Sequence, residues 1–309
     1  MTASRGIDVI GVPFNSSGLI DGVARAPAAL RRAGLIDAIR RLGIDVEDRG
    51  DVSLGATSAG RDPASHIISP GPLASMIRGV ESRVATSLAR GAFPLVIGGD
   101  CPILLGCLAA LDARYSYPGL VFVDGHEDSW PPDRSPSGEA ADMELGLALG
   151  LTDGGLPPDL RLAIPRLRYE DVVVLGPRDQ VELHEAGIET LDGRLVYRAS
   201  AEVAADPAAA ATEAVARMAA SAAWWFHVDL DVLATASLPA VDYQQPGGLD
   251  WDALGRLSAR MLAETDVAGW DVTIFNPDLD PEGSGAARIV GYIADALQAG
   301  GGRPHSPSR

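Results

Sequence analysis

Acidic side chains and one histidine follow two apolar segments of this 309-residue sequence at alternate positions. Asp124, His126 and Asp128 follow one apolar run, and Asp229 and Asp231 follow another. Alternate side chains of an extended backbone point to the same side, so both groups can face one cavity. Carboxylates crowded around an imidazole repel one another unless cations neutralise them, and such ligands suit manganese or a similar divalent ion.

Two cations fit this number of ligands more naturally than one. A water held between two cations would lose a proton near neutral pH and become the nucleophile of a hydrolysis. A third apolar run ends in Gly98-Gly99-Asp100-Cys101, where the glycines allow a tight turn and Cys101 would open the next helix. His227 alternates with Asp229, so it either faces the cavity or lies in the core beside it. A single Asp-x-Asp is most often a turn or a solvated edge, but three such segment ends together favour a metal centre.

The elements that position these residues form an alternating pattern of apolar runs and helical periodicity, which indicates an α/β fold with a mostly parallel sheet between helices. The strand candidates are residues 7–14, 94–97, 120–123, 172–175, 224–228 and 267–275. The helical patterns begin near residue 26 and cover 73–88, 208–223, 251–263 and 286–297. Ligands of open α/β sheets bind outside the carboxyl ends of the strands, where the three segments above end.

No break in composition and no fixed repeat interrupts this alternation, so we expect one domain over residues 1–299. The polar residues 300–309 predict a disordered tail. Residues 129–138 are rich in Pro and Ser and predict a loop over the mouth of the sheet.

The composition excludes several classes of protein. With 25 Lys and Arg against 42 Asp and Glu, the formal net charge is −17, which argues against nucleic acid and membrane partners. No apolar run approaches the roughly 20 residues of a spanning helix, and the first residues lack the apolar stretch of a signal peptide. Cys101 and Cys107 do not resemble a disulfide framework. We expect a cytoplasmic protein that acts on a small molecule.

These motifs together resemble the ureohydrolase family, which includes arginase, agmatinase and related amidinohydrolases. The resemblance covers most of the chain and runs through Gly11-Val12-Pro13-Phe14, Ala26-Pro27-Ala28-Ala29-Leu30-Arg31, Gly98-Gly99-Asp100-Cys101, Asp124-Gly125-His126-Glu127-Asp128, Gly176-Pro177-Arg178-Asp179, His227-Val228-Asp229-Leu230-Asp231-Val232-Leu233 and Phe275-Asn276-Pro277. It implies a three-layer α/β/α fold with a mostly parallel sheet of about eight strands. It also implies a dimanganese cluster, attack by metal-bound hydroxide on a guanidine-like carbon, and a homo-oligomer, either a trimer or a hexamer.

The resemblance also implies a ligand for each metal, position by position. One metal would be held by Cys101, Asp124, Asp128 and Asp231. The other would be held by Asp124, His126, Asp229 and Asp231. Asp128 would be the catalytic residue, because it would accept a hydrogen bond from the bridging hydroxide and orient it.

Cys101 stands where the family usually has histidine, as in a similar amidinohydrolase that acts on N-hydroxy-arginine. A thiolate would bring the ligand set to five anions against the formal +4 of two divalent ions. That surplus should raise the pKa of the bridging water, or favour a softer metal such as zinc. In the alternative interpretation, Cys101 is a protonated thiol that binds no metal and the site holds a single ion.

The recognition residues depart further from the family pattern. Ile274 stands where the family has a glutamate that pairs with the guanidinium, and an unpaired buried cation costs several kcal/mol. Val181 and Ala141 replace an acid and a histidine of arginases, so free arginine fits poorly. The candidate substrate-binding residues are Glu127, Trp130 and Ile274. Other acids that could serve at the cavity mouth are Glu139, Asp142 and Glu144, although charged loop residues are more often solvated.

We therefore expect a dimetal-dependent hydrolase that cleaves a C–N bond of a guanidino, N-hydroxyguanidino, formimino or amide compound. The alternative is a catalytically silent arginase-fold protein that acts as a binding or assembly module, because two recognition groups of arginases are missing. A nucleotide-binding protein is a weaker alternative, because Gly98-Gly99 lacks the glycine spacing of a phosphate cradle.

Overall fold

In the described part of the chain, eight strands form one sheet in which all neighbouring strands are parallel, in the order β2-β1-β3-β8-β7-β4-β5-β6. The computed structural model describes residues 6–152 and 154–301. The strands are β1 (Ile7–Val12), β2 (Val46–Asp51), β3 (Phe93–Gly98), β4 (Gly119–Val123), β5 (Val172–Leu175), β6 (Val196–Arg198), β7 (Trp224–Asp229) and β8 (Val267–Thr273). Most of the expected tail, residues 302–309, lies outside the described residues.

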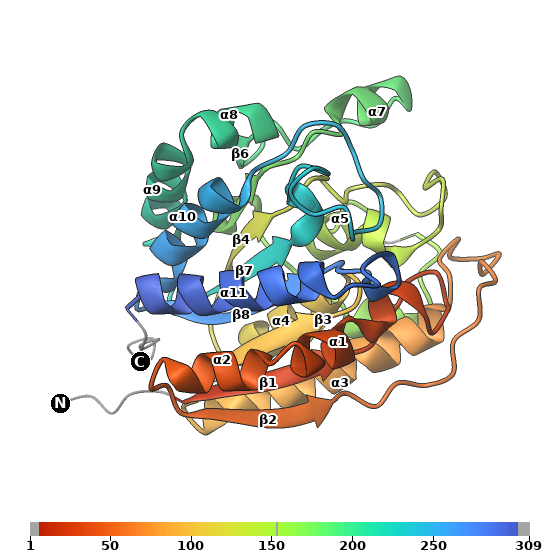
Figure 1. Cartoon of the computed structure of the whole chain (residues 1–309). Helices are drawn as coiled ribbons and strands as arrows, with labels where there is room; N and C mark the ends of the chain where they lie inside the picture. The colour runs from red at the N-terminus through yellow and green to blue at the C-terminus, as the bar shows by residue number, and fades with distance from the viewer. Residues whose placement is uncertain (1–5, 153, 302–309) are drawn as a thin grey trace.

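Helices cover both faces of the sheet (Figure 1). Each face has its own apolar core. One face carries α1 (Ala26–Arg32), α2 (Leu35–Arg41), α8 (Ser200–Ala205), α9 (Pro207–Met218), α10 (Trp251–Leu262) and α11 (Ser284–Ala299). The opposite face carries α3 (Pro70–Ala89), α4 (Ile103–Asp112), α5 (Glu144–Leu149) and α6 (Pro158–Ala163). This arrangement confirms the predicted three-layer α/β/α fold. Within the described residues, no helix is long and apolar enough to cross a membrane.

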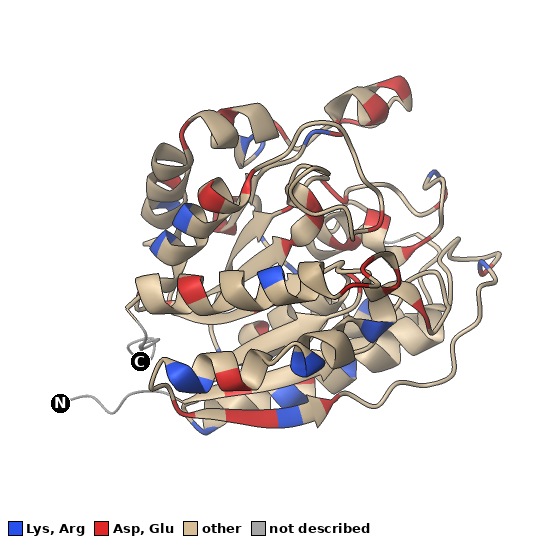
Figure 2. Ribbon diagram, viewed as in Figure 1, with Lys and Arg blue, Asp and Glu red and all other residues tan. Residues whose placement is uncertain are grey.

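The two edge strands are absent from the sequence prediction. The edge strand β2 reads Val-Glu-Asp-Arg-Gly-Asp, and Figure 2 shows charges of both signs along it. An edge strand has one neighbour only, so it tolerates charged side chains that a central strand cannot bury. One of them reaches inward, since Arg49 Nε lies 2.9 Å from Oδ1 of the buried Asp8 on β1. The opposite edge strand, β6, has only three residues.

The turn between β3 and α4 positions Cys101, and here the prediction needs a correction. The helix begins at Ile103 and not at Cys101. The Asp100 carboxylate holds the preceding turn, because it accepts hydrogen bonds from the backbone N–H of Ser16 (2.8 Å) and of Cys101 (3.1 Å). Cys101 is therefore fixed in a turn at the carboxyl end of β3.

We expect Gly106→Ala in α4 to lower the free energy of unfolding by about 1–3 kcal/mol, measured by urea denaturation. A Cβ atom at Gly106 would lie 2.7 Å from the backbone oxygen of Ile77 and 2.5 Å from Cβ of Val80, so α3 would have to move. Gly255→Ala in α10 is the matched control. Nothing lies within 4 Å of its added Cβ, so the better helix propensity of alanine should stabilise the fold by roughly 0.5–1 kcal/mol. Equal effects of the two substitutions would contradict this account of the α3–α4 contact.

Candidate metal centre

The carboxyl ends of β3, β4 and β7 bring all six sequence-predicted ligand residues together. β4 and β7 are neighbours in the sheet, and only β8 separates β7 from β3. Cys101 and the four aspartates are at most 6% exposed, whereas the side chain of His126 is 18% exposed. The six residues are Cys101, Asp124, His126, Asp128, Asp229 and Asp231.

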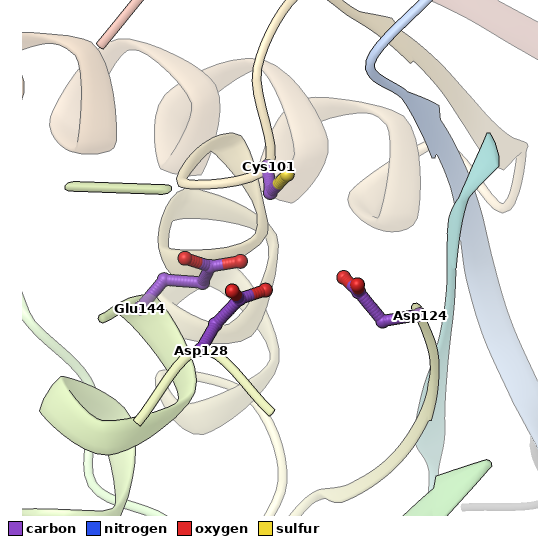
Figure 3. Close-up of side chains that lie close together, drawn as sticks. All are labelled: Cys101, Asp124, Asp128 and Glu144. Atoms are coloured by element: carbon purple, nitrogen blue, oxygen red, sulfur yellow. The ribbon is translucent and has the colours of Figure 1, made fainter. Parts of the chain in front are cut away.

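Their possible ligand atoms form three groups, within each of which the atoms lie no more than 4.8 Å apart. The first group is Cys101, Asp124, Asp128 and Glu144, which Figure 3 shows facing one another. The second is Asp124, His227 and Asp229, and the third is Asp124, His126 and Asp231. Asp124 belongs to every group, so its carboxylate lies where the three groups meet.

The structure places Asp229, the last residue of β7, and Asp231, in the turn after it, beside other residues than the resemblance implies. Cys101 Sγ lies 2.6 Å from Asp229 Oδ2, and His126 Nδ1 lies 2.9 Å from Asp231 Oδ2. The reason is a change of backbone direction. Asp229 ends β7 in an extended conformation, and the chain then turns so that the N–H of Asp231 donates to Asp229 Oδ1 at 2.8 Å. Asp231 therefore contacts His126, and Asp229 contacts Cys101.

His227 lies in the core beneath the centre and supports it. Its Nδ1 is 2.6 Å from Asp271 Oδ2, and its ring stacks on Phe122 with 4.8 Å between centroids. The indole N–H of Trp225 donates to the other oxygen of Asp271. The remaining ring nitrogen of His227, Nε2, lies 3.7 Å from Asp124 Oδ2. Although burial opposes it, the Asp271 carboxylate raises the pKa of His227 well above its ordinary value.

The segment after β5 braces the two ligand loops that follow β4 and β7. Arg178 donates from Nη2 to the backbone oxygen of Asp231 at 2.6 Å, and its own N–H donates to the backbone oxygen of Gly125 at 2.9 Å. Asp179 accepts a hydrogen bond from the N–H of Glu127 at 3.1 Å. The segment therefore connects the two ligand loops, although its side chains lie outside the three ligand groups.

The electrostatics of the centre favour cation binding. Burial first, and neighbouring carboxylates second, raise the pKa values of Asp128, Asp229 and Glu144 well above the ordinary carboxyl range. Burial alone would also raise the pKa of Asp124. The imidazoles of His126 and His227 outweigh this effect, so the pKa of Asp124 is lowered. Without cations, this many carboxyl groups would have to retain protons, and divalent ions would take the place of those protons.

Unsatisfied atoms support the same conclusion. Among the described residues, no hydrogen-bond partner lies at Asp124 Oδ2, at His227 Nε2 or at either carboxylate oxygen of Glu144, and all of these atoms are buried. Leaving a buried polar group without a hydrogen bond costs roughly 1–3 kcal/mol, and more when it is charged. Asp124 Oδ2 and His227 Nε2 compensate each other by charge alone, across 3.7 Å. The residues present therefore fit divalent cations.

A cavity of about 490 Å³ opens onto the centre. Asp128, Trp130, Ala141 and Ile274 are among its lining residues. Glu127 is absent from the lining, because its fully buried carboxylate accepts hydrogen bonds from the N–H of Leu191 (2.7 Å) and the hydroxyl of Tyr197 (3.0 Å).

Val181, which stands where arginases have an acid, lies outside the lining of the cavity, but the next residue does not. Val181 is 71% exposed, and the neighbouring Glu182 lines the cavity.

Two non-glycine residues beside the centre have a left-handed backbone, namely Asp128 (φ 45°) and Ile274 (φ 67°). Such strain concentrates where a site dictates the backbone, and for a β-branched residue such as isoleucine it is a genuine outlier.

Comparison with known proteins agrees with this geometry. The model of the arginase family matches residues 5–298. The chain belongs to the arginase family. It is 30% identical to the arginase of Bacillus caldovelox over 297 residues, which covers 93% of this chain and 96% of that protein. It is 33% identical to an arginase of Staphylococcus aureus (strain MRSA252) over 181 residues, or 58% of this chain and 59% of that protein.

The fold comparison extends over nearly the whole chain. The native structure of the Bacillus caldovelox arginase at pH 5.6 superimposes with a TM-score of 0.82 and 26% identity, covering 95% of this chain and 98% of that chain. The resemblance that the motifs indicated is thereby confirmed.

In this member of the arginase family, the metal centre includes one residue, Glu144, that the motifs did not predict as a ligand. Glu144 was expected only as a possible acid at the cavity mouth, but it is 0% exposed and belongs to the Cys101 group. A signal for its burial exists in the sequence, because Glu144 is the single charge in the apolar run Met143-Glu144-Leu145-Gly146-Leu147-Ala148-Leu149. The same signal marks Asp271, the single charge of β8.

We expect the affinity for Mn²⁺ to rise with pH, with a dissociation constant at least about tenfold lower at pH 8 than at pH 5.5. The raised pKa values of Asp128 and Asp229 mean that protons must leave before cations bind. Isothermal titration in buffers of different ionisation enthalpy would measure the released protons.

The metal-free protein should show the opposite trend in stability. Carboxyl groups whose pKa is raised by folding stabilise the fold at low pH, and that stability is lost as pH rises through the raised pKa values. An affinity for Mn²⁺ that is independent of pH, without proton release, would contradict this description of the centre.

Proposed function

We propose that this chain is a dimetal-dependent hydrolase that uses an activated water to cleave a C–N bond of a guanidino, N-hydroxyguanidino, formimino or amide compound. The observation that carries the proposal is the Asp124 carboxylate, shared by three groups of ligand atoms at a cavity. Membership of the arginase family supports the coarser statement of a metal-dependent hydrolase of guanidino C–N bonds.

The residues divide between two cation sites. Cys101, Asp128 and Asp229 would serve one site, His126 and Asp231 would serve the other, and Asp124 would serve both. An oxygen-rich set with an imidazole suits manganese, whereas ligation by the Cys101 sulfur would favour zinc at the first site. When bound, the cations would supply Lewis acidity and lower the pKa of a water.

Asp128 is the residue best placed to move protons. It lines the cavity, its carboxylate faces Asp124 and Glu144 (Figure 3), and its backbone is left-handed with φ 45°. We assign to it the hydrogen bond that orients the attacking water. It would accept the proton that this water loses and return it to the departing nitrogen, as general acid–base catalysis requires.

The cavity wall limits the substrate class. Ile274 presents an apolar side chain to the cavity, and Asp142 there already accepts hydrogen bonds from the hydroxyls of Ser135 and Ser137. An unmodified guanidinium would find little compensation at Ile274. This favours a less basic group, such as an N-hydroxyguanidine, a formimino group or an amide. Trp130 would form the opposing wall.

A silent arginase-fold protein that serves as a binding or assembly module is the second candidate, and the apolar Ile274 and Ala141 at the cavity favour it. Purified, Mn²⁺-loaded protein should be screened with guanidino, N-hydroxyguanidino, formimino and amide compounds for released urea, hydroxyurea or ammonia. Turnover of at least one class supports the hydrolase. Inertness toward all of them, with metal bound, supports the silent alternative.

We expect Cys101→His to change hydrolysis by about tenfold or more, because a neutral imidazole removes one anionic ligand and lowers the pKa of the activated water. The acidic limb of the pH–rate profile should move to lower pH. Cys107→Ser is the matched control, since Cys107 is buried within α4 and belongs to none of the ligand groups. An identical profile for wild type and Cys101→His would mean that Cys101 has no influence on the reaction.

A further inference from the structure

We propose that Glu144 is an additional ligand of the metal at the Cys101 end of the centre. The inference rests on the proposed function only in assuming that the centre binds metal. Helix α5 would then supply a metal ligand in addition to those at the three strand ends.

Glu144 lies inside the centre. It is the first residue of α5 and is 0% exposed. A carboxylate oxygen of Glu144 lies within 4.8 Å of ligand atoms of Cys101, Asp124 and Asp128. Figure 3 shows its carboxylate pointing toward Asp128 and the space below Cys101. The side chain is therefore directed into the centre and not toward solvent.

Both oxygens of Glu144 lack a hydrogen-bond partner among the described residues. Among the described residues, Asp124 and Asp179 each leave one buried oxygen without a partner, whereas Glu144 leaves both. Two other buried acids are fully paired. Glu127 accepts hydrogen bonds from Leu191 and Tyr197. Asp8, on β1, is paired with Arg49 and with the hydroxyl of Ser87. Buried polar groups in native proteins are nearly always paired, so the two unpartnered oxygens of Glu144, which face the Asp128 carboxylate, favour a bound cation as their partner.

A Glu144 ligand would offset the effect of the Cys101 sulfur on the choice of metal. A sulfur ligand favours soft ions, whereas carboxylate oxygens favour manganese and other hard ions. With Glu144, the first site offers carboxylates from Asp124, Asp128, Asp229 and Glu144 beside the sulfur of Cys101. The added oxygen ligand would keep that site selective for manganese although the family's usual histidine is missing.

The test compares Glu144→Gln with wild type and with Asp8→Asn, a buried acid outside the ligand groups. Mn²⁺ content is measured by mass spectrometry after gel filtration, and affinity by titration of the metal-free full-length chains. We expect two Mn²⁺ per wild-type and Asp8→Asn chain. Glu144→Gln should lose one Mn²⁺, or bind it at least about tenfold more weakly, and its ratio of bound Zn²⁺ to Mn²⁺ should rise.

Thermal unfolding separates a ligand from a merely structural residue. Without metal, Glu144→Gln should melt at the same or a higher temperature than wild type, because an unpaired buried carboxylate is removed. With excess Mn²⁺ it should melt lower, because bound metal stabilises the native state by mass action. Equal losses of melting temperature with and without Mn²⁺ would indicate a structural role and overturn the inference.

Glu144→Ala, which leaves room for water, repeats the comparison if Glu144→Gln does not fold. Two Mn²⁺ bound with wild-type affinity in either folded variant would also overturn the inference. Failure of the proposed function looks different, since wild type would then bind metal and respond to Glu144→Gln but hydrolyse none of the compounds screened.

Discussion

Crowding of buried carboxylates is the constraint on which the rest of this structure depends. Asp124, Asp128, Asp229, Asp231 and Glu144 converge in the interior, and among the described residues the imidazoles of His126 and His227 lie with them. The mutual repulsion of such groups has to be balanced by protons or by cations. A parallel sheet makes the convergence possible, because the carboxyl ends of its strands share one edge.

Contacts outside the three ligand groups hold this arrangement in place. The chain of hydrogen bonds from Trp225 through Asp271 to His227 extends from the core to the neighbourhood of Asp124. On the other side, Arg178 ties the loops after β4 and β7 together through backbone oxygens. Partners of this kind orient the ligands of a metal, and losing one typically lowers metal affinity or activity by about 10- to 100-fold. The α/β layers thus supply a rigid support, and the cavity above it sets which compounds can approach.

Six of the eight strands and the convergence of six candidate ligands could be predicted from the sequence, because central strands of a parallel sheet are continuous apolar runs. The edge strand β2 could not, since its charged residues carry no such signal. The pairing of Asp229 with Cys101 depends on a turn at Asp231 that spacing alone does not reveal. Glu144 and Asp271 are buried charges in apolar segments, and their partners lie on segments distant in the sequence.

The most direct test of the central claim is anomalous scattering from manganese in crystals of the wild-type chain grown with MnCl₂. The account predicts two peaks that share Asp124 as a ligand, one of them at Cys101, Asp128 and Glu144 and the other at His126 and Asp231. A map without peaks among these side chains, at saturating Mn²⁺, would contradict it.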